Sequence, residues 1–550
     1  MLLSRKGLSP AKQEDTVALF DKIKRTLEHD RPLTEEQRAF LDAVKASRPG
    51  QSFGLEAKAG TGKTYTIIRA AEELQGSVLM LAFNAKIRKE LQARAPRGCT
   101  VHTFHSYCNN VLFRSRKYEI KPGMAKIYNY MKNESGGVKQ FRARWPIAQG
   151  VSLAKNLAFG LIMDDSEENW REIYSEYDIR IPRGVSEDYV IEHARRMFRE
   201  TTRSKSMIDY DDMLYYVARD GVGGDRWDYV IVDEAQDTNL TQLRVLDHLF
   251  TGDTRLLFVG DPQQAIYGWR GAGVDAFDVM AQRYEAKVFD LTTTWRCPRA
   301  VVEEAQRVVP KIKYAPDANE GEVTTLHPSQ FDVTAVEPGN AVLCRNNAPI
   351  LQAALACLQA GVGCVMLGRD VAKAITHQTD AAIKLSGSIR DTGMFARLRA
   401  KYDAELSDRP FALAQAAEEV DMAATMFSYI QGREVPYTSE EELLSCIESI
   451  CNRLLSDELR TDRIVFSTIH RSKGLEWPSV YLIQPEKIPA KAARKVGGWH
   501  LEQERNLAYV AITRAKERLV YVSASEDPLK WILELSAANH EHRQEEDQAV

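Results

Sequence analysis

The sequence predicts an α/β protein with two parallel-sheet cores, each interrupted by a mainly helical insertion. Short apolar runs alternate with helical patterns, which is typical of parallel strands buried on both faces. The runs form two groups, which are 52–57, 77–83, 229–232 and 256–259, and then 341–344, 464–468 and 480–483. A long helical, charged stretch separates members of each group, and this separation predicts the two insertions.

The N-terminal part of the chain leads into the first strand and a Gly-rich turn. Residues 1–32 are polar and charged, and we expect a loosely attached helix there. A helical pattern follows, with Thr34 as a suitable N-cap. The strand 52–57 runs into the turn and then into a helix over 65–74. The opposite end of the chain, 536–550, is polar and acidic, and we expect a frayed tail.

Two interruptions divide the chain into segments. The first interruption contains no Gly-rich turn and no strand that ends in carboxylates, and the second is helical material, so we interpret both as insertions. The expected segments are the first core over 1–111 and 206–295, the first insertion over 112–205, the second core over 296–369 and 459–535, the second insertion over 370–458, and the tail over 536–550.

Composition excludes several classes of protein. Apolar residues make up 44% and charged residues 27%, which excludes wholesale disorder. The net charge of −4 excludes a globally basic nucleic-acid coat, so any nucleic-acid contact must come from a local groove. The eight cysteines include no C-x-x-C pair and no Cys/His cluster typical of zinc, and we expect buried thiols in a reducing compartment.

Signals for targeting or membrane insertion are missing from the sequence. The N-terminus has no apolar signal core, and no apolar run reaches 18 residues. We therefore expect no membrane contact and a cytoplasmic location, at the nucleoid or, for a viral protein, in the host cytoplasm.

Residues 57–64, AKAGTGKT, match the phosphate-binding loop with one departure, because Ala57 stands where the general pattern has glycine. Lys63 can reach the β- and γ-phosphates, and the Thr64 hydroxyl can hold Mg²⁺. The alternative is a chance Gly-rich turn, which the strand before and the helix after disfavour. The residues expected to contact the nucleotide here are Ala59, Gly60, Thr61, Gly62, Lys63 and Thr64.

The segment 230–237, VIVDEAQD, is an apolar strand that ends in carboxylates. Asp233 would bind Mg²⁺ through its water shell, and Glu234 would act as general base. The alternative is an acidic helix N-terminus, where carboxylates are favoured anyway. Combined with the Lys63 loop, the pattern predicts hydrolysis of ATP or GTP, without indicating what the energy drives.

The run 260–272, GDPQQAIYGWRGA, closely resembles a motif of the UvrD/Rep branch of superfamily 1 DNA helicases. Other segments resemble the remaining motifs of that family, in the family's order. They are LTEEQR (33–38), FNAK (83–86), TFH (103–105), DYDD (209–212), TWR (294–296), RNN (345–347), TIHRSKGLEW (468–477), and the run 504–516. The resemblance covers residues 33–520 and implies two RecA-like motor domains.

The resemblance implies further nucleotide-site residues. Gln37 would read the adenine edge, since an amide can donate and accept at once. Trp295 would stack on adenine in place of the family's usual Tyr, whereas the Thr294 beside it has no explanation from the motif. Arg296 and Arg514 would act as arginine fingers on the γ-phosphate, which Gln264 would also sense. Glu476 belongs to the late motif that joins nucleotide and DNA.

A second set of residues would contact DNA, by the same resemblance. Trp269 is the strongest candidate for stacking on bases, because a loop tip is a poor place to bury an indole. Core packing is the favoured alternative for Phe83 and Phe104, and His470 could equally be a buried core histidine. The other expected contacts are Lys86, Thr103, His105, Tyr267, Arg270, Arg345, Asn347 and Arg471.

The resemblance implies an ATP-dependent DNA helicase that moves 3′ to 5′ on single-stranded DNA and unwinds duplexes in replication, repair or recombination. ATP and Mg²⁺ are the expected cofactors, and single-stranded and duplex DNA and accessory replication or repair proteins are the expected partners. The alternatives are a DNA-stimulated translocase that remodels protein–DNA complexes, and a scaffold that has lost hydrolysis. A helicase–nuclease fusion is disfavoured because the chain ends soon after the last motif, and RNA as the track is not excluded by the residues alone.

Overall fold

The computed structural model describes residues 32–133, 138–182, 184–268, 271, 273–530, 532 and 534. The predicted N-terminal helix, the predicted acidic tail, Trp269 and Arg270 lie outside the described residues. Within the described part, none of the helices is both long and apolar enough to cross a membrane.

The first lobe is built on a six-stranded parallel sheet with the order β3-β2-β6-β7-β1-β8. Its strands are β1 (Ser52–Ala57), β2 (Val78–Ala82), β3 (Cys99–Thr103), β6 (Tyr229–Asp233), β7 (Arg255–Gly260) and β8 (Lys287–Leu291). Around it lie α2 (Glu35–Lys45), α3 (Lys63–Glu73), α4 (Ala85–Arg94), α5 (Phe104–Ser115), α10 (Tyr210–Asp220), α11 (Leu240–Leu249), α12 (Ala276–Arg283), and the short turns η2 (Ala235–Asp237) and η3 (Pro262–Gln264).

Strand β2 shows why these strands are continuous apolar runs. Leu79 and Leu81 pack into a cluster on one face of the sheet, which also contains Trp170 of the first insertion. Met80 packs into a cluster on the other face, together with Phe40 of α2. Both faces of the sheet are therefore covered, as the sequence predicted for a parallel sheet.

The second lobe is built on a seven-stranded parallel sheet with the order β11-β17-β16-β12-β15-β13-β14. Its strands are β11 (Glu322–Leu326), β12 (Ala341–Cys344), β13 (Cys364–Leu367), β14 (Leu455–Ser456), β15 (Ile464–Thr468), β16 (Trp477–Ile483) and β17 (Ala515–Val522). The helices are α13 (Arg299–Gln306), α14 (Asn347–Gln359), α19 (Ile469–Ser472), α20 (Lys491–Val496) and α21 (Gly498–Ile512), with η5 (Pro328–Gln330), η6 (Val333–Ala335) and η7 (Pro485–Lys487). A small parallel pair, β9 (Thr293–Thr294) and β10 (Lys313–Tyr314), lies at its start.

The first insertion contains the helices α6 (Ala125–Asn133), α7 (Arg144–Asn156), α8 (Glu167–Glu176) and α9 (Glu187–Thr201), with the turn η1 (Phe141–Ala143). A short parallel pair, β4 (Glu119–Ile120) and β5 (Met207–Ile208), lies where the chain enters and leaves it. Trp170 is wholly buried at its centre, edge-on to Phe159 and Phe198 at centroid distances of 5.2 and 5.8 Å.

The second insertion contains α15 (Asp370–Ser386), α16 (Met394–Glu405), α17 (Pro410–Gly432) and α18 (Glu440–Leu454). Helix α15 packs on the other three, and α17 also packs on α14 of the second lobe. The helices of both insertions lie inside the predicted segments 112–205 and 370–458. The limits of the predicted segments stay a prediction.

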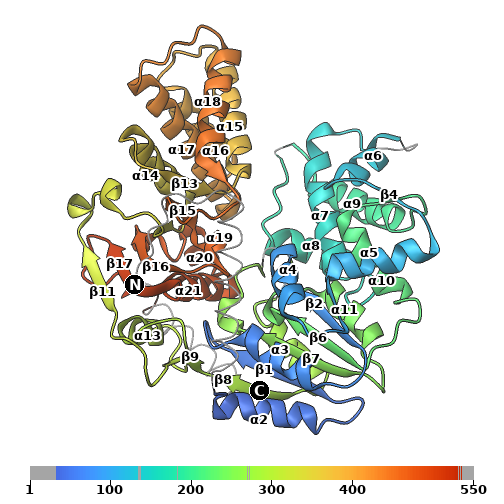
Figure 1. Ribbon diagram of the computed structural model, residues 1–550. Coiled ribbons are helices and arrows are strands. Elements are labelled where there is room, and N and C mark those ends of the chain that lie inside the picture. Colours follow the sequence, from blue (N-terminus) through green and yellow to red (C-terminus); the bar gives the residue numbers. More distant parts are fainter. Residues whose placement is uncertain are drawn as a thin grey trace, which may run out of the picture.

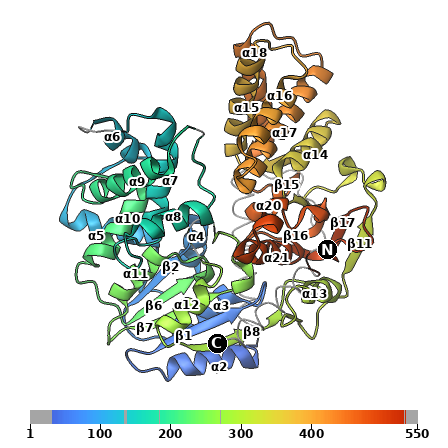
Figure 2. The same cartoon turned by 180° about the vertical axis from the view of Figure 1, so that it is seen from behind.

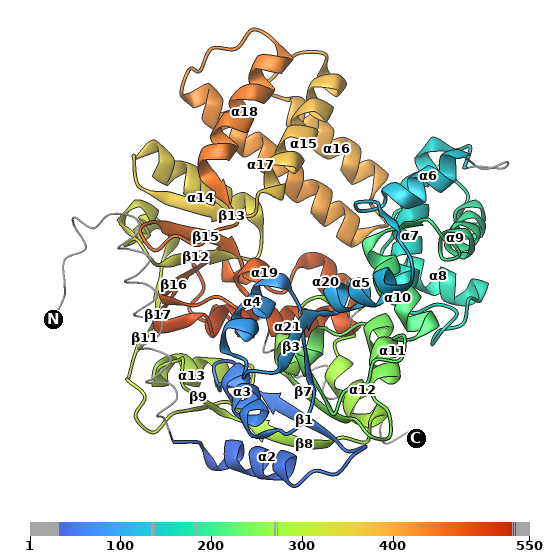
Figure 3. The same cartoon turned by 45° about the vertical axis from the view of Figure 1, so that its right-hand side comes forward.

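The two lobes stand side by side, with a helical insertion above each of them (Figure 1). The same two columns are visible from behind in Figure 2. In Figure 3 the lower end of the second insertion approaches the first insertion. Hydrogen bonds confirm this approach, because the backbone N–H groups of Phe411 and Ala412 donate to Asp178 Oδ2, each at 3.0 Å.

Candidate functional site

The phosphate-binding loop lies between β1 and α3, at the carboxyl edge of the first sheet. Gly60 and Gly62 have φ values of +74° and +87°, which glycine adopts without strain. A Cβ on Gly60 would lie 2.6 Å from the Cβ of Arg296, so the loop packs closely on the start of the second lobe. Because Lys63 and Thr64 open α3, the positive end of this helix faces the loop.

The acidic end of β6 lies beside this loop. Lys63 Nζ is 3.7 Å from Glu234 Oε1, and the backbone N–H of Glu234 donates to Asp233 Oδ1 at 2.9 Å. Burial raises the pKa of the Asp233 carboxyl to about 7, and the neighbouring Glu234 carboxylate adds to the rise. Burial would also raise the pKa of Glu234, but Lys63 and Lys473 outweigh it and lower that pKa to about 2. Glu234 is thus ionised at neutral pH.

The second lobe brings both predicted arginines to the same cleft. Arg514 Nη2 is 3.5 Å from Gln264 Oε1, and Arg514 Nη1 donates to the Leu475 carbonyl at 3.1 Å. Arg296 Nε pairs with Glu476 Oε2 at 2.7 Å. Burial lowers the pKa of Arg514 to about 9, and the charge of Arg296 adds to the drop. Arg514 thus brings a buried positive charge to the cleft, which a polyanion would stabilise.

Gln37 and Trp295 both lie beside the loop. The Gln37 side chain accepts from the Thr34 backbone N–H at 3.0 Å and donates to Thr66 Oγ1 at 3.1 Å, so both of its ends have protein partners. The Trp295 backbone N–H donates to the Gly60 carbonyl at 2.9 Å, and its indole is partly exposed. Adenine recognition by either residue stays a prediction.

Three residues of this cleft were not singled out from the sequence. The Tyr509 hydroxyl accepts a hydrogen bond from the backbone N–H of Ala59 at 2.9 Å, across the two lobes. Lys473 Nζ pairs with Asp237 Oδ2 at 2.6 Å and donates to the Gln264 carbonyl at 2.7 Å. All three lie inside motifs that the sequence analysis recognised, and this position was the signal by which they could have been found.

Thr294, which the motif left unexplained, also has a place in this cleft. Its Oγ1 accepts from the backbone N–H of Arg296 at 3.3 Å, and the side chain is wholly buried. A Cβ on Gly60 would come within 2.5 Å of this oxygen. Thr294 thus packs against the phosphate-binding loop and supports the backbone that carries Arg296.

A groove of about 1380 Å³ lies between the lobes and the two insertions. Several residues predicted to contact DNA line it, namely Phe83, His105, Tyr267, Arg345 and His470. The rings of Phe83 and Tyr267 are stacked, with centroids 5.8 Å apart and planes 14° apart. Burial lowers the pKa of His470 well below its ordinary value, so its imidazole is neutral at physiological pH.

Other predicted DNA contacts have different surroundings. Phe104 is buried in the core of the first lobe, as the packing alternative predicted, and Thr103 caps the N-terminus of α5. Arg471 donates to the Leu367 carbonyl at 2.9 Å and pairs with Asp370 at 2.6 Å, away from the groove lining.

The remaining predicted DNA contacts are either exposed or already paired with carboxylates. Lys86 is exposed on α4. Asn347 donates to Glu418 at 2.9 Å, and Arg345 holds Glu504 through two nitrogens at 2.7 and 3.0 Å. The Arg345 guanidinium is therefore already paired with a carboxylate where it reaches the groove.

One short segment joins the nucleotide cleft to the groove. Gln264 faces Arg514, whereas Tyr267, three residues later, stacks in the groove. Lys473 Nζ lies 5.0 Å from the centre of the Tyr267 ring while it holds the Gln264 carbonyl. A shift of Gln264 would therefore be transmitted to the stacked rings.

One class of nucleoside triphosphatases closes two parallel-sheet lobes on its nucleotide. In this class one lobe carries a phosphate-binding loop and the other supplies arginines, as in this chain. Comparisons with known sequences identify the family within this class. Residues 33–285 match the sequence model of the UvrD/REP helicase N-terminal domain, and residues 378–526 match that of the UvrD-like helicase C-terminal domain. The chain belongs to the UvrD/Rep family of DNA helicases.

Individual relatives are distant. The F-box DNA helicase protein 1 of Schizosaccharomyces pombe is 23% identical over 89% of this chain and 57% of its own length. The ATP-dependent DNA helicase Rep of Escherichia coli is 24% identical over 48% of this chain and 43% of its own length. RecBCD enzyme subunit RecB of Mycobacterium tuberculosis is 42% identical over 16% of this chain and 8% of its own length. The chain spans about half the length of the first two curated relatives it matches.

Proposed function

We propose that this chain is an ATP-dependent DNA helicase that moves 3′ to 5′ along single-stranded DNA and separates duplexes. The observation that carries the proposal is the segment from Gln264 to Tyr267, which contacts the nucleotide cleft at one end and the groove at the other. A cytoplasmic location at DNA, with accessory replication or repair proteins as partners, is part of the proposal. Both family matches support it.

In this proposal the cleft binds ATP between the lobes. Lys63, Arg296 and Arg514 neutralise the charge of the phosphates, and Glu234 accepts the proton of the attacking water. Thr64 and Asp233 would hold Mg²⁺, which supplies positive charge at the β- and γ-phosphates. The Asp233 carboxyl fits such a cation, because it is buried beside the Glu234 carboxylate, and both effects raise its pKa to about 7.

The groove would hold the DNA strand. Phe83 and Tyr267 present stacked rings to bases of any sequence, and stacking of this kind is worth about 1–3 kcal/mol per base. Trp269 would add a further ring. Each closure of the lobes on ATP would move the Gln264–Tyr267 segment and advance the strand.

Strand separation tests the proposal. The protein is incubated with duplexes that carry either a 3′ or a 5′ single-stranded tail, with ATP and Mg²⁺, and the separated strands are measured. We expect unwinding of the 3′-tailed duplex alone. Hydrolysis stimulated by single-stranded DNA without unwinding of either duplex would favour the remodelling translocase, and absence of both activities would overturn the proposal.

Glu234→Gln tests whether Glu234 is the general base of ATP hydrolysis. Removal of the ionised carboxylate is expected to lower the ATP hydrolysis rate by about 10²- to 10⁴-fold while ATP still binds. Hydrolysis is measured by phosphate release and binding with a fluorescent ATP analogue. Glu73→Gln is the control, because Glu73 is an exposed carboxylate on the same lobe that pairs with Lys45. Turnover near the wild-type rate in Glu234→Gln would exclude this residue as the base.

A further inference from the structure

Two large aromatic side chains are exposed at the rim of the groove, on the first insertion. Phe141 is 78% exposed in η1, and Trp145 is 50% exposed at the start of α7. Both line the groove together with the motif residues of its floor. Exposed aromatic side chains of this size, four residues apart in the sequence and lining one groove, are candidates for an interaction site, and neither residue belongs to a recognised motif.

Helix α7 connects this rim to the floor. Trp145, Gln149, Ser152 and Asn156 recur at helical spacing on one face, and all four line the groove. The Asn156 end is held at the floor, because Asn239 Nδ2 donates to Asn156 Oδ1 at 2.8 Å. Trp145 lies eleven residues earlier, so the face extends about 16 Å from floor to rim.

The rim also carries positive charge. Arg142 on the first insertion and Lys401 on α16 of the second insertion line the same groove, and neither forms an ion pair within the described part of the chain. The carboxylates nearby already have partners, since Glu405 pairs with Arg180 at 3.3 Å and Asp178 accepts the N–H groups that begin α17.

We propose that Trp145 and Phe141 stack on bases of single-stranded DNA as the strand passes between the two insertions. The groove-lining face of α7 then extends the strand's path beyond the motif-lined floor by several nucleotides. Aromatic rings together with cations are the side chains that bind unpaired strands without regard to sequence. This inference rests on the proposed function, since it places the same strand in the upper part of the groove.

Oligonucleotide length tests this extension. We measure the binding of two fluorescein-labelled oligo-dT strands by fluorescence anisotropy. They are about 8 and about 16 nucleotides long, which spans typical site sizes for single-stranded DNA. We expect Trp145→Ala to weaken binding of the longer oligonucleotide about tenfold and of the shorter one about twofold or less. Trp145→Phe retains a stacking ring and should keep the longer oligonucleotide within about threefold of wild type.

The matched control is Tyr314→Ala, which removes a partly exposed aromatic ring from β10, outside the groove lining. It should bind both oligonucleotides as wild type does. If the wild-type protein binds neither oligonucleotide, the proposed function itself fails. If wild type binds both and Trp145→Ala binds the longer one equally tightly, the present inference is overturned.

Photo-crosslinking gives a readout that does not depend on a variant folding. Wild-type protein is irradiated with the longer oligonucleotide carrying 5-iodouracil at successive positions, and crosslinked peptides are identified by mass spectrometry. We expect crosslinks to the peptide with Phe141 and Trp145 at some positions, besides those to the floor. Crosslinks confined to floor residues such as Phe83 and Tyr267 would overturn the inference.

Discussion

Tyr509 joins the two lobes at the phosphate-binding loop through one hydrogen bond. Its hydroxyl is wholly buried and accepts from the Ala59 N–H at 2.9 Å. A backbone N–H of the loop is therefore satisfied by a side chain from the other lobe, 450 residues away in sequence. The conformation of the loop and the closure of the lobes are linked through this contact.

Tyr509→Phe is expected to loosen this link. The phenyl ring keeps the packing but leaves the Ala59 N–H without its acceptor, a loss of about 1 kcal/mol. Hydrogen exchange of the loop amides around Ala59, measured by mass spectrometry without nucleotide, should become about fivefold faster. Tyr521→Phe is the control, because its buried hydroxyl bonds Glu304 within the second lobe at 2.9 Å. Unchanged exchange at Ala59 in Tyr509→Phe would show that the contact does not restrain the loop.

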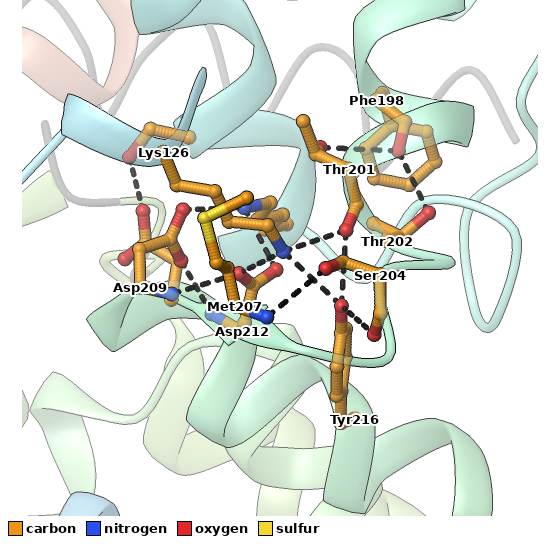
Figure 4. Close-up of polar contacts among 12 residues, drawn as sticks. Lys126, Phe198, Thr201, Thr202, Ser204, Met207, Asp209, Asp212 and Tyr216 are labelled. Atoms are coloured by element: carbon orange, nitrogen blue, oxygen red, sulfur yellow. Dashed lines mark hydrogen bonds and ion pairs between the residues drawn. The ribbon is translucent and has the colours of Figure 1, made fainter. Parts of the chain in front are cut away.

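At the scale of elements, a buried charge cluster fixes the first insertion on α10 (Figure 4). Lys126 of α6 pairs with Asp212 at 2.6 Å, and Lys155 of α7 pairs with Asp209 and Asp212 at 2.7 and 2.8 Å. Lys126 also donates to the Thr201 carbonyl at 2.6 Å, at the end of α9. All four charged side chains are buried, so each depends on its partners for compensation.

Asp212→Ala is expected to destabilise the protein strongly. It leaves two buried ammonium groups short of a carboxylate, and breaking a buried pair of this kind costs about 3–5 kcal/mol. The loss is measured as a lower urea midpoint of unfolding, followed by the fluorescence of Trp170 and the other tryptophans. Asp220→Ala on the same helix breaks only the exposed pair with Arg219, which is worth less than about 1 kcal/mol. Equal, small effects of both changes would contradict a supporting role for the cluster.

On the scale of the whole molecule, the two insertions meet across the groove. Asp178 follows α8 and accepts the N–H groups of Phe411 and Ala412 at the start of α17, as an N-cap supplied by another part of the chain. Arg409 donates to the Ile179 carbonyl at 3.2 Å beside it. A strand in the groove would therefore be enclosed on this side.

Asp178→Ala is expected to weaken the contact between the two insertions, so that the groove is less closed on this side. Loss of the cap weakens the contact between the insertions by about 1 kcal/mol, so a bound oligonucleotide should dissociate about fivefold faster. Stopped-flow displacement of a labelled oligo-dT by unlabelled competitor measures the rate. Asp188→Ala, an exposed residue of the first insertion paired with Arg171, serves as control. Equal dissociation rates for the two variants would show that the contact does not retain the strand.

Much of the fold follows from local patterns. Strands β12 and β15 occupy the predicted 341–344 and 464–468, because each is a largely apolar segment that is buried along its whole length. Helix α3 begins at Lys63, two residues before its predicted start, because Gly62 already adopts the turn that precedes it. The fold class is confirmed, together with the family resemblance. The strands β13 and β14 were not predicted, and β14 is only two residues long and forms a strand through its pairing with β13.

The sequence alone determined the chemistry that adjacent residues carry, namely a loop with Lys63 and Thr64, a strand end with Asp233 and Glu234, and the class of fold that presents them. Only the tertiary structure decided which distant groups meet. The contact of Tyr509 with Ala59 and the path along α7 from Asn156 to the rim are examples. Chain neighbours share a local conformation, whereas contacts between lobes depend on how whole sheets and helices pack.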